Sequence, residues 1–170
     1  TKSIFLVTNA QEPGMLERMR LMNSMPTQLY ISTNAPNREI FKKVNVPVYK
    51  DAWERFVRSL EISRKMNTRR VMRLTMIKGI NMAEELMNGY ANLIDTANPH
   101  FVEVKAYMWM GYSRKRLKEE NMPSHEEIRN YARDLAKRAN LKYVDEREES
   151  RIVLLQNKNN MIDRFIIKPG

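Results

Sequence analysis

The sequence predicts an α/β fold in which mostly parallel strands are wrapped by helices, as in part of a TIM-like (β/α) barrel. Short apolar runs alternate with stretches whose apolar residues recur at helical spacing, the pattern of repeated strand–helix units. No Pro-, Gly- or Ser-rich linker divides the 170 residues, so one domain is expected. Neither GxGxxG nor GxxxxGKS/T occurs, and the chain has only five glycines, which favours a barrel segment over an open doubly wound sheet.

The N-terminal part of the chain contains three successive strands, each followed by helical sequence. Strands are expected over residues 3–9, 28–32 and 70–77. Helices are expected over residues 13–23, 37–44, 51–66 and 83–97. Asn37 and Asp51 are expected to cap the second and third helices, because such side chains accept hydrogen bonds from the first free N–H groups.

The C-terminal part adds a fourth strand over residues 101–107 and a helix over residues 124–139. Ser124 is expected to cap this helix, and the two glutamates that follow lie in its first turn, where the helix dipole favours them. Short strands are expected over residues 142–145 and 152–155, and a further strand is considered over residues 162–168.

The strand over residues 101–107 has an unusual polarity pattern. Alternation places apolar side chains on one face and the set Phe101, Glu103, Lys105 and Tyr107 on the other. Strands of a parallel sheet are covered on both faces, so an acid and a base on one face are costly unless that face lines a site. The alternative is an edge strand with a solvated charged face.

Polar side chains also end the other expected strands. Thr8 and Asn9 follow the first strand, Ser32 ends the second, and Thr75 lies near the end of the third. In a (β/α) barrel, the carboxyl ends of the strands surround the ligand. Each residue alone is weak evidence, because Asn and Ser also form turns and caps.

The net charge of +10 and the isoelectric point near 9.9 favour an anionic partner, preferably nucleic acid, over a general solubility role. Trp109 and Tyr112 lie next to the basic run Arg114, Lys115 and Arg116. Aromatic and basic side chains together suit the unstacked bases of single-stranded RNA loops. The alternative is a core tryptophan beside a solvated helix.

Cysteine is absent, which excludes disulfides, thiol nucleophiles and cysteine-ligated metal sites within the chain. Lys105 and Lys78 are candidate Schiff-base amines or electrostatic partners of an anion. For Lys78 a solvated loop position is preferred. For Lys105 the alternative is an ion pair with Glu103 or with another strand, and Glu103 has two candidate partners, Lys105 and Arg73. His100 and His125 are isolated, and His125 is expected to be a first-turn helix residue.

No apolar run approaches the ~20 residues of a membrane span, so a cytoplasmic protein is expected.

Several stretches resemble the radical S-adenosylmethionine enzymes that make the tricyclic wyosine base of tRNA, the 4-demethylwyosine synthases. The matching stretches are FLVTNA at 5–10, PTQLYIS at 26–32, IFKKVNVPVYKDAWERF at 40–56, RLTMIKGINM at 73–82, FVEVKAYMWMGYSRKRL at 101–117, ENMPSHEEI at 120–128 and VDEREESRIVLL at 144–155. The spacing of KAYM, the GxSRxRL segment and NMPSHEE is specific, and the likeness extends to about residue 155.

The resemblance implies the C-terminal half of a radical S-adenosylmethionine barrel over residues 1–156, with a polar extension at 157–170. It implies a 4Fe–4S cluster and S-adenosylmethionine as cofactors. The implied reaction condenses pyruvate carbons onto N1-methylguanosine in the anticodon loop of phenylalanine tRNA. By position, the cofactor-binding role falls to Asn9, Ser32, Arg73 and Thr75. Lys105 and Tyr107 are then expected to face the substrate.

The chain departs from the family pattern at several points. The CxxxCxxC motif that binds the cluster is absent, so the chain alone is expected to be inactive. The full-length enzyme is expected to be a monomer. Asn34 replaces the usual Asp, and Trp109 and Arg147 replace the usual His. Two other functions remain open: a stand-alone RNA-binding module without catalysis, and a Schiff-base keto-acid lyase that uses Lys105.

Overall fold

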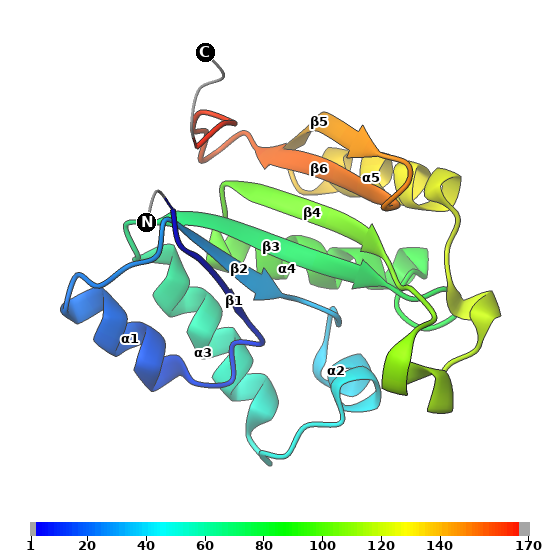
Figure 1. Cartoon of the computed structure of the whole chain (residues 1–170), viewed down its shortest axis with the longest axis horizontal. Coiled ribbons are helices and arrows are strands. Elements are labelled where there is room, and N and C mark those ends of the chain that lie inside the picture. Colours follow the sequence, from blue (N-terminus) through cyan, green and yellow to red (C-terminus); the bar gives the residue numbers. More distant parts are fainter. Residues whose placement is uncertain (1–2, 167–170) are drawn as a thin grey trace.

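Residues 3–166 are described by the computed structural model, and they are organised around one six-stranded sheet (Figure 1). Four strands are parallel neighbours in chain order: β1 (Phe5–Thr8), β2 (Gln28–Ser32), β3 (Arg69–Met76) and β4 (Phe101–Ala106). A hairpin then completes the sheet in the order β4-β6-β5, with β6 (Ile152–Asn157) antiparallel to β4 and β5 (Leu141–Arg147) antiparallel to β6. The predicted mostly parallel α/β class is confirmed.

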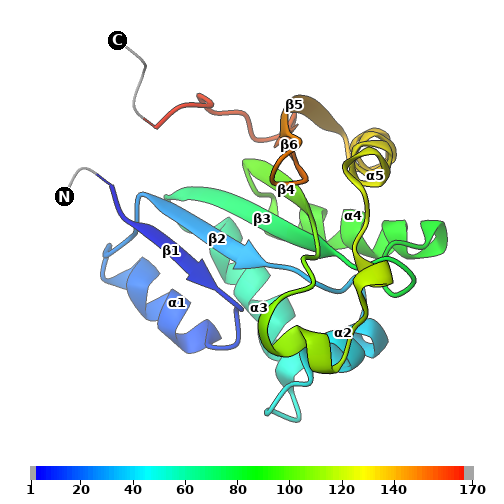
Figure 2. The same cartoon turned by 45° about the vertical axis from the view of Figure 1, so that its right-hand side comes forward.

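Helices cover one face of this sheet and leave the other without a helical layer among the described residues (Figure 2). The covering helices are α1 (Pro13–Leu21), α3 (Ala52–Arg64), α4 (Met87–Ala97) and α5 (His125–Arg138). Helix α2 (Arg38–Asn45) lies beyond the carboxyl end of β2 (Figure 1). Short 3₁₀ turns occur at η1 (Glu84–Leu86), η2 (Gly111–Lys115) and η3 (Glu119–Asn121).

Alternation along the strands separates the hydrophobic core from a polar face. On β3 and β4 the core side consists of apolar residues that pack under the helices, among them Leu74 and Val104. The opposite side, called here the open face, carries the intervening residues of β2, β3 and β4. The neighbours in register across this face are Ser32 and Arg73, Arg73 and Glu103, and Thr75 and Lys105.

Two predicted helix caps are confirmed and one is wrong. The Asn37 side chain accepts a hydrogen bond from Ile40 N–H at 2.9 Å, and Ser124 forms a capping box with Glu127. Asp51 precedes α3 but makes no capping hydrogen bond. Its carboxylate instead accepts from Arg55 Nε at 3.0 Å, because this guanidinium, one turn away, competes with the backbone for the same oxygen.

Two further expectations are corrected by the sheet. Strand β4 lies between β3 and β6, so the alternative of a solvated edge strand is wrong. No strand forms over residues 162–166, and residues 167–168 lie outside the described part of the chain. The carbonyls of this segment are engaged by side chains: Arg69 donates to Asp163 at 2.6 Å and to Arg164, and Gln156 donates to Ile162 at 2.7 Å.

Candidate functional site

An ion pair lies at the centre of the open face. Arg73 Nε donates to Glu103 Oε1 at 2.6 Å, and the Arg73 guanidinium lies 4.7 Å above the Tyr30 ring. The Glu103 side chain is only 11% exposed, so the pairing satisfies a largely desolvated carboxylate. Of the two partners considered for Glu103, the structure therefore shows Arg73 and not Lys105.

Lys105 is adjacent to this pair but is not part of it. It lies between Thr75 of β3 and Ile152 of β6, and it is half-buried. No described residue forms a hydrogen bond or ion pair with its ammonium group. The alternative of an ion pair between Lys105 and Glu103 is therefore wrong. A partly desolvated cation without a protein partner is suited to binding an anionic group.

A cleft of about 430 Å³ opens at the carboxyl ends of β1 and β2. Asn9, Gln11, Ser32 and Asn34 form one wall, and the segment at 41–49 forms the other. None of the described side chains that line this cleft is charged. No described residue donates a hydrogen bond to the buried Gln11 Oε1 or Asn34 Oδ1, so the cleft fits a group that carries N–H or O–H donors.

The predicted cofactor residues fall into two neighbouring places. Asn9 and Ser32 line the cleft, as expected for ligand contacts at strand ends. Arg73 and Thr75 lie next to them on the open face of β3, where Arg73 is held by Glu103. The wall at 41–49 was missed in the sequence, because α2 was recognised only as a helix and its position above the strand ends is a tertiary feature.

The segment at 107–118, called here the basic loop, follows β4 at the same end of the sheet. Tyr107 is buried, and its hydroxyl group is hydrogen-bonded to Ser113 Oγ at 2.8 Å, so this side chain anchors the loop. Trp109 Nε1 donates to the Leu117 carbonyl at 2.9 Å. The alternative of a core tryptophan is wrong, because Trp109 is only half-buried and Arg114 lies 4.9 Å above its ring.

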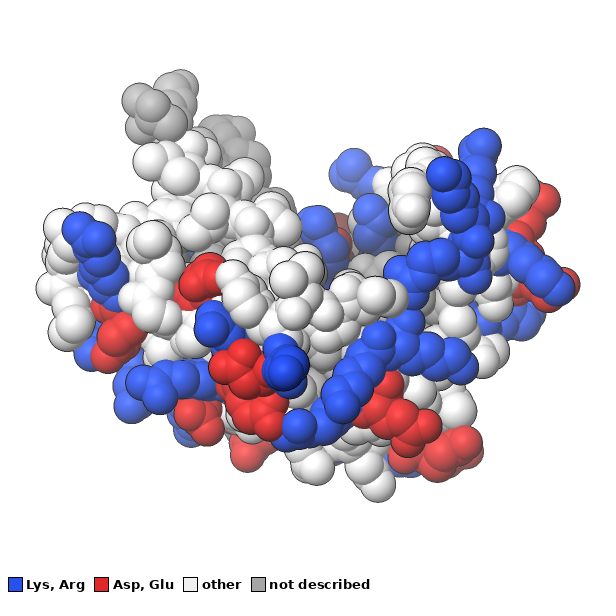
Figure 3. Space-filling view, turned by 90° about the horizontal axis from the view of Figure 1, so that it is seen from below, with Lys and Arg blue, Asp and Glu red and all other residues white. Residues whose placement is uncertain are grey.

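The rest of the basic loop is strongly exposed. Tyr112 is 75% exposed, with Lys115 4.8 Å from the centre of its ring. Arg116 donates to the carbonyls of Lys43 and Val44 at 2.9 and 3.3 Å, which ties the loop to the end of α2. Figure 3 shows this side of the molecule, where a band of lysine and arginine side chains crosses the surface.

Both histidines have structural contacts. His100 Nδ1 accepts from Arg70 N–H at 3.0 Å, and burial together with the nearby Arg70 lowers the pKa of His100 to about 4. His125 is the first residue of α5, as expected, and its Nε2 lies 2.9 Å from Glu146 Oε2. Neither imidazole lies on the open face.

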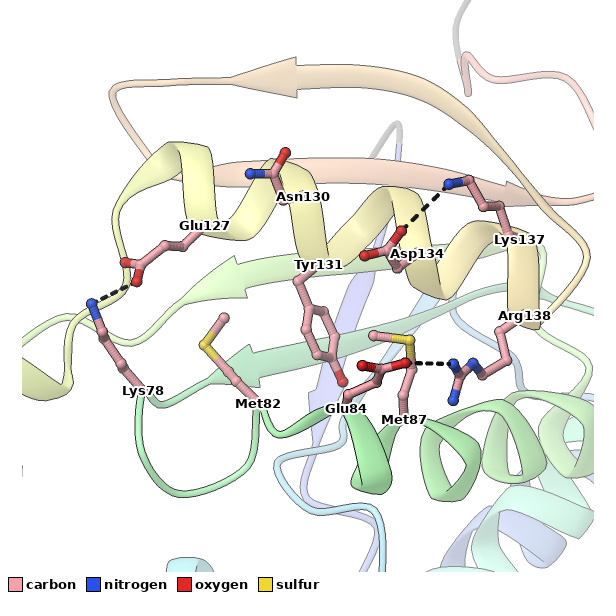
Figure 4. A pocket seen from close by; sticks show the side chains of 10 residues that line it. All are labelled: Lys78, Met82, Glu84, Met87, Glu127, Asn130, Tyr131, Asp134, Lys137 and Arg138. Atoms are coloured by element: carbon pink, nitrogen blue, oxygen red, sulfur yellow. Dashed lines mark hydrogen bonds and ion pairs between the residues drawn. The ribbon is translucent and has the colours of Figure 1, made fainter.

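A larger hollow of about 750 Å³ lies on the helical side, between η1–α4 and α5 (Figure 4). Its floor contains Met82 and Tyr131, and burial raises the pKa of the Tyr131 hydroxyl. Lys78 Nζ lies 2.5 Å from Glu127 Oε1 at one end. Lys78 lies in a turn and its side chain is 53% exposed, which confirms the expected solvated loop position, and Glu127 pairs with its ammonium group.

Residues 3–166 contain no cluster of three or more His, Cys, Asp or Glu side chains that could hold a metal ion. Among the same residues, no helix is both long enough and apolar enough to cross a membrane.

Comparison with known proteins gives a consistent set of relatives. Residues 96–157 match the family described as wyosine base formation. The S-adenosyl-L-methionine-dependent tRNA 4-demethylwyosine synthase of Pyrococcus abyssi is 49% identical over 152 residues, which are 89% of this chain and 44% of that protein. The chain therefore spans less than half the length of this relative.

Solved structures show the same relationship. The structure of TYW1 with a lysine–pyruvate adduct bound superimposes with a TM-score of 0.78 at 33% identity, over 93% of this chain and 48% of that chain. HemN of Escherichia coli, a radical SAM coproporphyrinogen III oxidase, superimposes with a TM-score of 0.60 at 14% identity, over 90% of this chain and 34% of that one. The HemN likeness shows the fold alone, a part of a radical SAM barrel.

Proposed function

Because the chain belongs to the family of tRNA 4-demethylwyosine synthases, we propose that it forms the substrate-facing part of a radical S-adenosylmethionine enzyme that modifies tRNA. The reaction proposed for the whole enzyme, a lyase, condenses pyruvate carbons onto N1-methylguanosine in phenylalanine tRNA. The observation that supports this most is the open face, where no described residue pairs with the half-buried Lys105 ammonium, and whose carboxyl end carries the uncharged cleft and the exposed basic loop. We place this enzyme in the cytoplasm, as a monomer.

The residues present fit one proposed cofactor and not the other. The chain has no cysteine, so it does not fit a 4Fe–4S cluster, and it is inactive without cluster ligands from elsewhere. The cleft does fit S-adenosylmethionine, which supplies the radical precursor when bound. Asn9 and Ser32 would contact its ribose and carboxylate, and the free oxygens of Gln11 and Asn34 would accept from its hydroxyl and amino groups. Thr75 and Arg73 would close the cofactor site on β3.

We assign Lys105 to the substrate side as the cation that binds the carboxylate of pyruvate. Its support is its half-buried position, in which none of residues 3–166 pairs with its ammonium group. An ionic role predicts that borohydride traps no pyruvate on this chain. Trapping that disappears in Lys105→Met would instead establish a covalent Schiff base and the keto-acid lyase alternative.

We assign RNA binding to the basic loop. Tyr112 is exposed for stacking on an unpaired base, and Arg114 and Lys115 lie beside aromatic rings where they can also meet phosphates. Trp109 supports the loop and is half-buried. Arg116 contributes less to phosphate binding than expected, because α2 carbonyls already occupy its guanidinium.

Equilibrium binding to S-adenosylmethionine and to an anticodon stem–loop RNA tests the proposal. The enzyme proposal predicts that both bind and that Ser32→Ala weakens the cofactor alone. RNA binding without any cofactor binding would favour the stand-alone RNA-binding module, whose only requirement is the basic loop. Absence of RNA binding would contradict both functions.

A further inference from the structure

Three residues distant in sequence meet behind the carboxyl end of β3. The Lys78 N–H donates to the Asn121 carbonyl at 2.9 Å, and Asn121 Nδ2 donates back to the Lys78 carbonyl at 3.0 Å. The Lys78 ammonium lies 2.5 Å from Glu127 Oε1 in the first turn of α5. In Figure 4 the Lys78 side chain points toward α5 and Glu127.

The same cluster is attached to the end of the basic loop. Asn121 Oδ1 accepts from the Lys118 N–H at 2.8 Å, so one amide side chain joins the loop to β3. The residue before Lys118 is Leu117, whose carbonyl accepts the Trp109 indole N–H. Displacement of Asn121 would therefore move the Leu117 end of the hydrogen bond that Trp109 donates within the loop.

The charges in this cluster are internally compensated. Hydrogen bonding to Lys78 is the largest cause that lowers the pKa of Glu127, with backbone bonding at Ser124 next, so the carboxylate is ionised near neutral pH. The Lys78 ammonium is therefore neutralised by Glu127 and is a poor ligand for a phosphate group. Lys78 therefore contributes to the surface by holding Asn121 and the end of the basic loop in place.

We propose that Lys78, Asn121 and Glu127 are positioning residues that hold the basic loop in its RNA-binding arrangement. The functional consequence rests on the RNA binding proposed above, whereas the holding of the loop is measurable without RNA. Lys78 and Glu127 line the hollow on the helical side of the sheet, so they act on the substrate only through the loop.

Two variants that each remove one positive charge distinguish a positioning role of Lys78 from a direct contact with RNA. Lys78→Met is expected to weaken stem–loop RNA binding about tenfold, which is about 1.4 kcal/mol, with an unchanged salt dependence. Lys78→Arg should restore binding, because arginine can pair with the same carboxylate. The control Lys137→Met removes one lysine from an 81% exposed side chain of α5 and should bind like the parent chain.

Glu127→Gln gives the sharper test, because electrostatics alone and a positioning role predict opposite changes in RNA affinity. Removal of a negative charge near an RNA-binding surface should strengthen binding. A positioning role predicts that Glu127→Gln binds RNA more weakly than the parent chain. The control Asp134→Asn, on the same helix, should bind RNA equally or slightly more strongly. Glutamine preserves the capping box with Ser124, so α5 retains its N-terminal cap.

Trp109 fluorescence in a Trp53→Phe background reports on the loop directly, since these are the two tryptophans of the chain. Lys78→Met is expected to shift its emission to longer wavelength, and Lys137→Met is not. Identical emission in the two variants, or RNA affinity in Lys78→Met equal to that in Lys137→Met, would overturn the inference. If the parent chain binds no RNA, the proposed function fails, and the emission shift still decides whether the cluster holds the loop.

Discussion

At the scale of single residues, the open face depends on the pairing of Glu103 with Arg73. A carboxylate that is only 11% exposed is tolerable because the guanidinium satisfies it at 2.6 Å. The pair also orders the middle of the face next to Lys105, which remains without a described partner. Charge on this face is thus divided into a satisfied pair and an available cation.

Glu103→Gln should lower the free energy of unfolding by about 1–3 kcal/mol, because it leaves the Arg73 cation without a counter-charge. Urea unfolding monitored by circular dichroism measures this difference. Glu120→Gln is the control, since that side chain is 73% exposed and its pairing with Lys118 contributes little. Equal stabilities of the two variants would contradict the role given to the pair.

The low pKa of His100 predicts that the free energy of unfolding depends on pH above the range in which carboxylates titrate. Its pKa is about 4 in the folded chain against 6.5 in the unfolded chain, so the unfolded state binds more protons between these values. Stability should therefore fall as the pH drops from 6.5 to 4, by about 1–2 kcal/mol once solvent screening is allowed for. In His100→Asn, whose amide oxygen can accept from Arg70 N–H, this part of the decline should disappear from urea unfolding curves. A decline confined to pH below 4 in the parent chain would be inconsistent with this assignment.

At the scale of elements, α4 packs directly against the turn that follows β2. A Cβ placed on Gly89 would lie 2.6 Å from the Pro36 carbonyl oxygen and 2.8 Å from Pro36 Cβ. The absence of a side chain thus sets the distance between α4 and the segment that carries Asn34 into the cleft. Packing of this kind depends on tertiary approach and leaves no local signal in the sequence.

Gly89→Ala is expected to destabilise the fold by about 1–3 kcal/mol, although alanine is the better helix former, because backbone atoms must move. The matched control is Gly14→Ala in α1, where nothing lies within 4 Å and a gain of up to about 1 kcal/mol is expected. Thermal unfolding measures whether Gly89→Ala lowers the stability and Gly14→Ala raises it. A stabilising Gly89→Ala would show that the α4 contact is looser than described.

Local rules predicted some helix ends and failed at others for a physical reason. Asn37 and Ser124 cap as expected, because nothing nearby competes for their oxygens. Asp51 fails because Arg55, one turn later, takes its carboxylate. No strand forms over residues 162–166, because side chains of Arg69 and Gln156 donate to the carbonyls of residues 162–164.

At the scale of the whole molecule, the parallel sheet and its polar face were predictable from alternation and strand order. The cleft was predictable only in part, because strand-end polarity identified Asn9 and Ser32 but not the wall at 41–49. The link between Lys78 and Glu127 was not predicted, since it joins the end of β3 to α5, with α4 and β4 lying between them in the chain. Specific contacts of this kind follow from the fold and not from local pattern.

The salt dependence of RNA binding tests the central claim most directly. We expect the logarithm of the affinity of an anticodon stem–loop to fall with the logarithm of salt concentration, with a slope of about −2 or steeper. Combined substitution of Arg114, Lys115 and Lys118 by methionine should reduce that slope by about 2, because each lost phosphate contact removes about 0.7. An affinity that is independent of salt, or a slope unchanged in the triple variant, would contradict the assignment of this surface to tRNA.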